Sequence, residues 1–280
     1  MKHGAYISSV GAFSDPLLLT ELAQEAEEIG WDGVFIFDHI GHPHETVDPW
    51  VTLSAMAMKT EKIKLGTVVT PLARRRPWKL ARETMTLDHL SNGRLILGVG
   101  LGWTDKEFTV FGEEGNLKTR AEKVDEGLEI LNGLWSGEPF SFEGKHYSII
   151  ETQFLPKPVQ SPRIPIWVCG AWGPKKASFR RAARWDGVIS ILAPGVNRAI
   201  LPEEVADIKA YTRKHRETDN SFDIVVILWS EGSHSAEEMA SVKMYEEAGV
   251  TWWLEDLTTD RFGTLEQVRE RLRKGPVGRR

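Results

Sequence analysis

Short runs rich in β-branched and aromatic residues alternate along the chain with longer segments of helical periodicity, and this alternation constrains the fold more than any other feature. Most of the short runs are apolar at both odd and even positions, as in Val34-Phe35-Ile36-Phe37. That pattern is typical of parallel strands covered by helices. Eight such strands are predicted, at residues 3–10, 33–38, 62–70, 94–101, 164–169, 187–192, 222–230 and 250–256.

A helical segment is predicted after each strand. Proline stands at a plausible first helical position after Asp15, Asp48, Arg76, Gly173 and Leu201. Capping boxes are expected at Thr104…Glu107, Ser235…Glu238 and Thr264…Gln267. The predicted helices span residues 16–30, 49–60, 77–91, 105–135 with a break near 112–116, 174–184, 202–217, 236–248 and 264–274.

Eight β-then-α units in 280 residues predict a (β/α)8 TIM barrel, an α/β fold, as a single domain over residues 1–280. Residues 137–163 interrupt the alternation. There an alternating segment around Glu143-Gly144 predicts a β-hairpin insertion before the fifth strand.

Charge and cysteine content exclude several classes of protein. The formal net charge of −5 argues against a nucleic-acid-binding protein, which usually carries a basic face. The single cysteine, Cys169, permits no internal disulfide and no cysteine-rich zinc site, and it fits a reducing cytoplasm. No apolar run reaches the ~18 residues of a membrane helix, and no secretory signal pattern is present. We expect a cytoplasmic enzyme that acts on small molecules.

In such a barrel the active site lies at the carboxyl ends of the strands, so the strand ends supply the candidate residues. Asp38 and His39 end the second strand, and a histidine there can move protons near neutral pH. They are the catalytic candidates. The alternative is an aspartate that caps a turn and a histidine exposed in a loop.

Three other segments are candidates for ligand binding. The glycines of Gly98-Val-Gly-Leu-Gly102 either let a flat ligand approach the backbone or satisfy packing inside the barrel; the run fails the dinucleotide pattern because Trp103 replaces its last glycine. The segment 170–174 reads either as a phosphate-binding turn at a helix start or as an ordinary turn. The Arg74–Arg76 cluster either faces an anion or forms a solvated loop.

A metal site is the weaker alternative. His42-Pro43-His44 has the spacing of two metal ligands close to His39. The later strand ends that would have to complete the site, the fifth and the sixth, contain no histidine. We therefore expect no metal ligands, and a metal-dependent barrel hydrolase remains only an alternative.

Taken in order, these segments resemble the luciferase-like monooxygenases, the bacterial luciferase superfamily of flavin- or F420-dependent oxidoreductases. The resemblance covers nearly the whole chain. Its residues are Phe37-Asp38-His39, the segments 65–71, 87–94 and 97–103 with Glu107-Phe108, Arg120…Glu126, Leu134-Trp135, the segments 142–147 and 165–170, and 182–187.

The resemblance implies that FMN or the deazaflavin F420 lies in the mouth of the barrel and carries the redox chemistry. It implies a bulge with a non-prolyl cis peptide in Val68-Val69-Thr70, supporting the central ring, and a role for His39 beside the ring. The turn Gly170–Trp172 would hold the cofactor phosphate. The cofactor-binding residues so expected are Val69, Thr70, Gly100, Leu101, Gly102, Gly170, Ala171, Trp172 and, for the phosphate, Arg75.

The resemblance leaves the choice between FMN and F420 and the identity of the small organic substrate open. Sugar-phosphate dehydrogenases of the family carry an acid directly after the glycine run, where Trp103 stands here, which argues against that substrate. A flavin reductase and a second copy of the chain, as a homodimer, are the expected protein partners. A non-catalytic flavin-binding barrel is the alternative to an enzyme.

Overall fold

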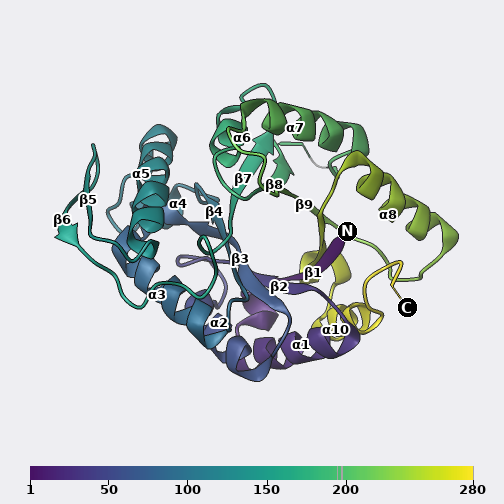
Figure 1. Cartoon of the computed structure of the whole chain (residues 1–280). Coiled ribbons are helices and arrows are strands. Elements are labelled where there is room, and N and C mark those ends of the chain that lie inside the picture. Colours follow the sequence, from purple (N-terminus) through teal and green to yellow (C-terminus); the bar gives the residue numbers. More distant parts are fainter. Residues whose placement is uncertain (194, 197, 280) are drawn as a thin grey trace.

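The computed structural model describes residues 1–193, 195–196 and 198–279. Eight parallel strands close into a barrel in the order β1-β10-β9-β8-β7-β4-β3-β2, and helices surround it (Figure 1). The predicted (β/α)8 barrel is confirmed. The barrel strands are β1 (Lys2–Ile7), β2 (Gly33–Ile36), β3 (Lys64–Pro71), β4 (Leu95–Gly100), β7 (Ile166–Trp172), β8 (Gly187–Leu192), β9 (Asp223–Leu228) and β10 (Trp252–Leu257).

The helices follow the predicted phase. The predicted break near residues 112–116 is confirmed, because the segment 105–135 forms two helices, and a short unpredicted helix follows β10. The helices are α1 (Pro16–Ile29), α2 (Pro49–Lys59), α3 (Pro77–Leu90), α4 (Lys106–Thr109), α5 (Leu117–Trp135), α6 (Ala177–Ala182), α7 (Pro202–His215), α8 (Ala236–Ala248), α9 (Thr259–Phe262) and α10 (Leu265–Arg273), with 3-10 turns η1 (Gly11–Phe13) and η2 (Leu72–Arg74).

The start of α6 differs most from the prediction. The strand before it runs on through Trp172, which pairs with Leu192 of β8. Gly173 and Pro174 therefore lie in a turn, and the helix begins only at Ala177. The predicted start at residue 174 is wrong: the strand is longer than predicted, and the chain bends at Gly173 and Pro174 before the helix begins.

Side chains of the strands alternate between two cores, as strand geometry requires. The outer core lies between the strands and the helices. The inner core fills the barrel, and its lower part is aromatic: the ring centroids of Trp167 and Trp252 are 5.2 Å apart, as are those of Phe35 and Trp167. The barrel is therefore packed, and a ligand can enter only at its mouth.

The predicted insertion contains an antiparallel hairpin of β5 (Phe140–Glu143) and β6 (Ser148–Thr152), which lies beside α5 at the edge of the molecule (Figure 1). The Glu126 carboxylate of α5 accepts hydrogen bonds from the backbone N–H groups of Lys145, His146 and Tyr147. These bonds attach the hairpin loop to the outer helix layer.

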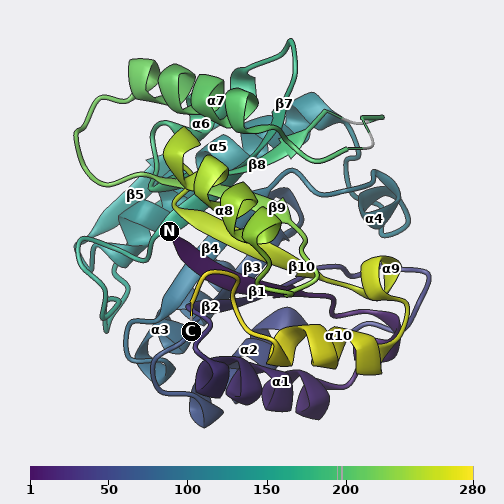
Figure 2. The same ribbon diagram turned by 90° about the vertical axis from the view of Figure 1, so that its right-hand side faces the viewer.

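The carboxyl ends of the strands define one end of the barrel. Helices α4 and α9, which follow β4 and β10, lie together at that end (Figure 2). Among the helices of the described residues, none is both long and apolar enough to cross a bilayer.

Candidate active site

Asp38 and His39 follow β2, and their side chains have different surroundings. Asp38 is 2 % exposed, and its carboxylate accepts hydrogen bonds from Arg74 (Nη2–Oδ1 2.9 Å) and Arg75 (Nη2–Oδ1 2.8 Å and Nε–Oδ2 3.0 Å). A carboxylate this buried with two guanidinium partners is a charged anchor for the loop after β3. Asp38 is thus a positioning group.

Glu107 of α4 is the partner of His39. Its Oε1 lies 3.0 Å from Nδ1 of His39, and its Oε2 accepts a hydrogen bond from Nη1 of Arg74 at 3.2 Å. Burial raises the pKa of Glu107, but the hydrogen bond and charge of His39 and the charge of Arg74 outweigh it, so the net pKa lies below the ordinary value. Glu107 therefore holds a negative charge against the imidazole.

The sequence pattern assigned Glu107 to a capping box with Thr104, and this is wrong. Asp105 is the residue that precedes the helix, and Thr104 Oγ1 accepts only from the Lys106 N–H. The Glu107 side chain turns inward, where His39 and Arg74 are its hydrogen-bond partners. No pairwise spacing rule identifies this contact, since 68 residues separate it from His39.

The open edge of His39 faces aromatic neighbours. Its ring centroid lies 5.8 Å from Trp103, edge to face, and 5.3 Å from His42. Trp103 is 75 % exposed, which is unusual for so large an apolar side chain. Nε2 of His39 has no hydrogen-bond partner in the part of the chain that the structure describes. The imidazole is oriented at Nδ1 and available at Nε2.

Beside β2 in the barrel, β3 and β4 form the next part of the mouth. A cis peptide joins Val68 and Val69, as the resemblance implied, and the β3–β4 register shifts between Thr67 and Thr70. A Cβ atom added at Gly100 would lie 2.5 Å from Cγ2 of Val69. Only glycine avoids this clash, so close packing of Val69 against the β4 backbone accounts for Gly100.

The structure shows what surrounds Thr70, Leu101 and Gly102, whose contact with the cofactor stays a prediction. Thr70 is fully buried, and its hydroxyl donates to Oγ1 of Thr67 at 2.9 Å, so its side chain is used inside the fold. Leu101 packs against the outer core. Gly102 has a φ of +89°, a conformation that favours glycine, and turns the chain toward α4.

At the end of β7 the side chains alternate, and the odd positions face the barrel. Ala171 follows Cys169 and Trp167 on the inner side. Gly170 and Trp172 face outward: a Cβ at Gly170 would meet the Phe179 ring at 2.9 Å, and the Trp172 ring lies against Phe179 and Lys176. Packing against α6 and the turn before it thus accounts for Gly170 and for the Trp172 side chain. A ligand in the mouth could contact these two residues only through their backbone.

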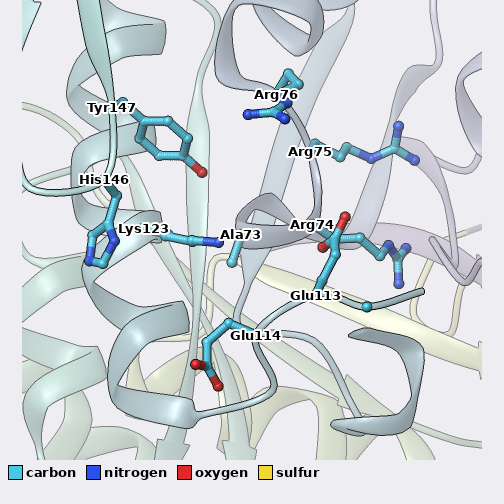
Figure 3. Close-up of a pocket in the computed structure, with 10 residues that line it drawn as sticks. Ala73, Arg74, Arg75, Arg76, Glu113, Glu114, Lys123, His146 and Tyr147 are labelled. Atoms are coloured by element: carbon cyan, nitrogen blue, oxygen red, sulfur yellow. The ribbon is translucent and has the colours of Figure 1, made fainter. Parts of the chain in front are cut away.

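The three arginines divide between two environments. Arg74 and Arg75 are neutralised by Asp38 and Glu107, whereas Arg76 lies over the Trp78 ring. All three line a cavity of about 320 Å³ beside the mouth (Figure 3). The remaining lining residues are Ala73, Gly112, Glu113, Glu114, Lys123, His146 and Tyr147.

The histidines after His39 do not assemble a metal site. The ring centroids of His42 and His44 are 5.4 Å apart. Within residues 1–193, 195–196 and 198–279, no three His, Cys, Asp or Glu side chains converge as metal ligands would. Burial and the neighbouring His39 and His44 lower the pKa of His42.

Comparison with known proteins identifies the family of the chain. The family model described as luciferase-like monooxygenase matches residues 9–271. An F420-dependent glucose-6-phosphate dehydrogenase of Amycolatopsis mediterranei (strain U-32) is 29% identical over 259 residues, which is 83% of this chain and 75% of that protein. An F420-dependent hydroxymycolic acid dehydrogenase of Mycobacterium tuberculosis (strain ATCC 25618 / H37Rv) is 33% identical over 60% of this chain, but the match spans only 47% of that protein.

Solved structures share the fold. The F420-dependent secondary alcohol dehydrogenase in complex with an F420-acetone adduct superposes with a TM-score of 0.75 at 19% identity, over 91% of this chain and 92% of the other. The monooxygenase RslO1 from Streptomyces bottropensis superposes with a TM-score of 0.68 at 26% identity, over 89% and 78% of the two chains.

Proposed function

The chain belongs to the luciferase-like monooxygenase family, and we propose that it transfers a hydride between F420 and a small organic substrate. The family fits the barrel, and the relatives named for F420 support this cofactor over FMN. F420, when bound, supplies the group that accepts or donates the hydride. The chain itself supplies binding, orientation and proton transfer.

The contact between His39 and Glu107 carries the proposal. Glu107 holds Nδ1 of His39 at 3.0 Å, so the tautomer and ring orientation are set and Nε2 is left to exchange a proton in the mouth. Arg74 connects Glu107 to Asp38, which keeps the loops after β2, β3 and β4 in one arrangement. Trp103 lies edge to face with the imidazole at this edge of the mouth.

The cofactor would be held by apolar contacts to its ring and by backbone groups that bind its phosphate. Val69, Gly100 and Ala171 form the surface against which its ring would lie, and the backbone of Gly170–Trp172 is the surface proposed for its phosphate. Arg75 makes two hydrogen bonds to Asp38, so its first role is to orient the Asp38 carboxylate. Because one-fifth of its side chain is exposed, contact with the cofactor phosphate is its proposed second role.

A fluorescence titration of the purified chain with F420 and with FMN tests the cofactor. Tighter binding of F420 is expected, and saturation by FMN alone would overturn the proposal. His39→Gln should leave the Kd of F420 within a few fold and lower turnover by about 100-fold, the size of a lost proton-transfer group. Unchanged turnover would remove His39 from the mechanism. Cofactor binding without turnover against any substrate would favour a carrier role.

A flavin monooxygenase is the second candidate, and the 26% identity to the monooxygenase RslO1 favours it. This alternative requires a source of reduced FMN, and a flavin reductase is the proposed partner. FMN saturation together with oxygen consumption on addition of that reductase would support it. A homodimer is also proposed, and sedimentation velocity tests it.

A further inference from the structure

The cavity of about 320 Å³ beside the mouth, which we call the side cavity, is separate from the surfaces proposed for the substrate and the cofactor ring. In the described part of the chain, its lining does not include His39, Val69, Gly100 or the turn Gly170–Trp172. Its walls come from the turn η2, the loop after α4, helix α5 and the hairpin loop (Figure 3). Its volume lies within the range of small-ligand sites, so it is a candidate for a second ligand.

Four arginine and lysine side chains line the side cavity within the described residues, and the fold neutralises only two of them. Arg74 and Arg75 are paired with buried carboxylates. Arg76 and Lys123, by contrast, have no carboxylate oxygen within 4.0 Å among residues 1–193, 195–196 and 198–279. The lining therefore presents two positive charges that no acidic side chain compensates at close range.

Tyr147 adds an unpaired hydroxyl to the same cavity. The residue is only 8 % exposed, yet among the described residues its hydroxyl has no hydrogen-bond partner, and Figure 3 shows it directed into the cavity. Burial raises the pKa of Tyr147 to about 12, so the phenol stays protonated near neutral pH and can donate. A largely buried donor without an acceptor is unfavourable unless water or a ligand accepts its hydrogen bond.

The Trp78 ring and helix α5 hold these three groups in place. The Tyr147 ring packs edge to face on Trp78 with centroids 6.1 Å apart, and the Arg76 guanidinium lies 5.9 Å from the centroid of the same ring. The backbone N–H of Tyr147 donates to Oε2 of Glu126 at 3.1 Å, on the helix that carries Lys123. The donors are thus positioned before a ligand binds, which lowers the cost of binding.

Two uncompensated cations and a neutral donor match a phosphoryl group, which carries up to two negative charges and three acceptor oxygens. We propose that the side cavity binds a phosphoryl dianion through the Arg76 guanidinium, the Lys123 ammonium group and the Tyr147 hydroxyl. Free phosphate and a phosphate monoester both present this group. A single carboxylate would leave one of the two positive charges without a counter-charge. The inference does not depend on the proposed function, because the side cavity contains none of the residues proposed to react.

Two acids, Glu113 and Glu114, also line the side cavity and oppose an anion. Both are exposed, so water and salt screen their charges. Oε1 of Glu114 accepts a hydrogen bond from the backbone N–H of Asn116 at 2.8 Å, a contact that the amide oxygen of glutamine can also make. Glu114→Gln therefore removes one opposing charge with little change of shape, and it should strengthen the binding of phosphate.

Isothermal titration calorimetry with inorganic phosphate tests the proposal, at constant ionic strength, above neutral pH, and with and without saturating F420. The variants are Lys123→Gln, Glu114→Gln and Tyr147→Phe, the last of which removes a hydroxyl and no charge. Lys118→Gln is the matched control, because it removes the same charge from the same helix at a side chain that is 85 % exposed and outside the lining. Glycerol 3-phosphate and acetate are titrated in the same way, and thermal unfolding of every variant is measured first.

We expect the wild type to bind phosphate saturably, in the presence of F420 as in its absence. Lys123→Gln and Tyr147→Phe should each raise the Kd by about 10-fold, the size of a lost hydrogen bond to a charged group. Glu114→Gln should lower the Kd, and Lys118→Gln should change it by less than about 2-fold. Tighter binding of glycerol 3-phosphate than of phosphate would identify a monoester as the ligand, and the reverse order would identify the free anion.

Three results would overturn the inference: no saturable binding of phosphate, an unchanged Kd in Tyr147→Phe, or acetate bound as tightly as phosphate. Loss of phosphate binding on saturation with F420 would overturn it as well, because the side cavity would then belong to the cofactor. Failure of the chain to bind F420 would contradict the proposed function and leave this inference intact.

Discussion

Nδ1 of His39 lies 3.0 Å from Oε1 of Glu107, and the same carboxylate accepts a hydrogen bond from Arg74, which also binds Asp38. The loops after three strands are joined by this chain of charges. Because each of these four side chains is largely buried, we expect the network to behave as a unit rather than as separate contacts.

Replacement of Glu107 by Gln tests that unit through catalysis. The amide keeps the shape but removes the charge that orients and stabilises a protonated His39, so kcat should fall by about 10- to 100-fold, while F420 affinity changes little. Glu113→Gln, which alters another acid close to Arg74 in the side cavity, is the matched control; equal loss in both would contradict the assignment (Figure 3).

Removal of Asp38 should act mainly on stability. Asp38→Ala leaves Arg74 and Arg75 without their shared carboxylate, and breaking such a buried pair lowers the free energy of unfolding by about 3–5 kcal/mol. Denaturant unfolding monitored by tryptophan fluorescence measures this. The exposed pair of Lys79 and Glu83 supplies the control, since Glu83→Ala should change the free energy by less than about 1 kcal/mol.

The contact between Gly100 and Val69 predicts a rescue experiment. Gly100→Ala places a methyl group against Cγ2 of Val69, and such overpacking should lower stability by about 1–3 kcal/mol and weaken F420 binding. Adding Val69→Ala to the same chain removes the clash and should restore part of both properties. Thermal unfolding and the F420 titration report them separately, and a double variant no better than Gly100→Ala would show that the contact is not the cause.

The buried His3 at the start of β1 predicts loss of stability in acid. Burial and the charge of Arg279 lower the pKa of His3 from its ordinary 6.5 to about 4. The unfolded chain therefore binds a proton between these values that the folded chain does not, so its contribution is present above pH 6.5 and is lost as pH falls toward 4. The loss amounts to about 2 kcal/mol by pH 5.

His3→Gln removes this titration. The free energy of unfolding of the variant should fall less between pH 7 and pH 5 than that of the wild type. Urea unfolding at several pH values measures the difference. Parallel curves for the two chains would show that other groups cause the acid sensitivity.

Much of the site depends on side chains that the sequence places far apart. Asp38 and His39 are recognisable because they end a strand, and strand ends in a barrel converge. Glu107 is not, because its helical position suggested a cap, and only the packing of α4 against the mouth turns it toward His39. Thr70 and Trp172 also stand at strand ends, but strand alternation turns their side chains into the fold, so their contact with a cofactor through the backbone stays a prediction.

The sequence by itself determined the eight-stranded barrel, the hairpin insertion, the family, and the end of the barrel that carries the site, because these follow from periodicity and from local motifs. Only the tertiary structure decided which charges pair, which glycine packs against Val69, and which nitrogen of His39 lacks a partner among the described residues. Those properties depend on a few ångströms between residues from different strands, and the register and bulge of the closed barrel set those distances.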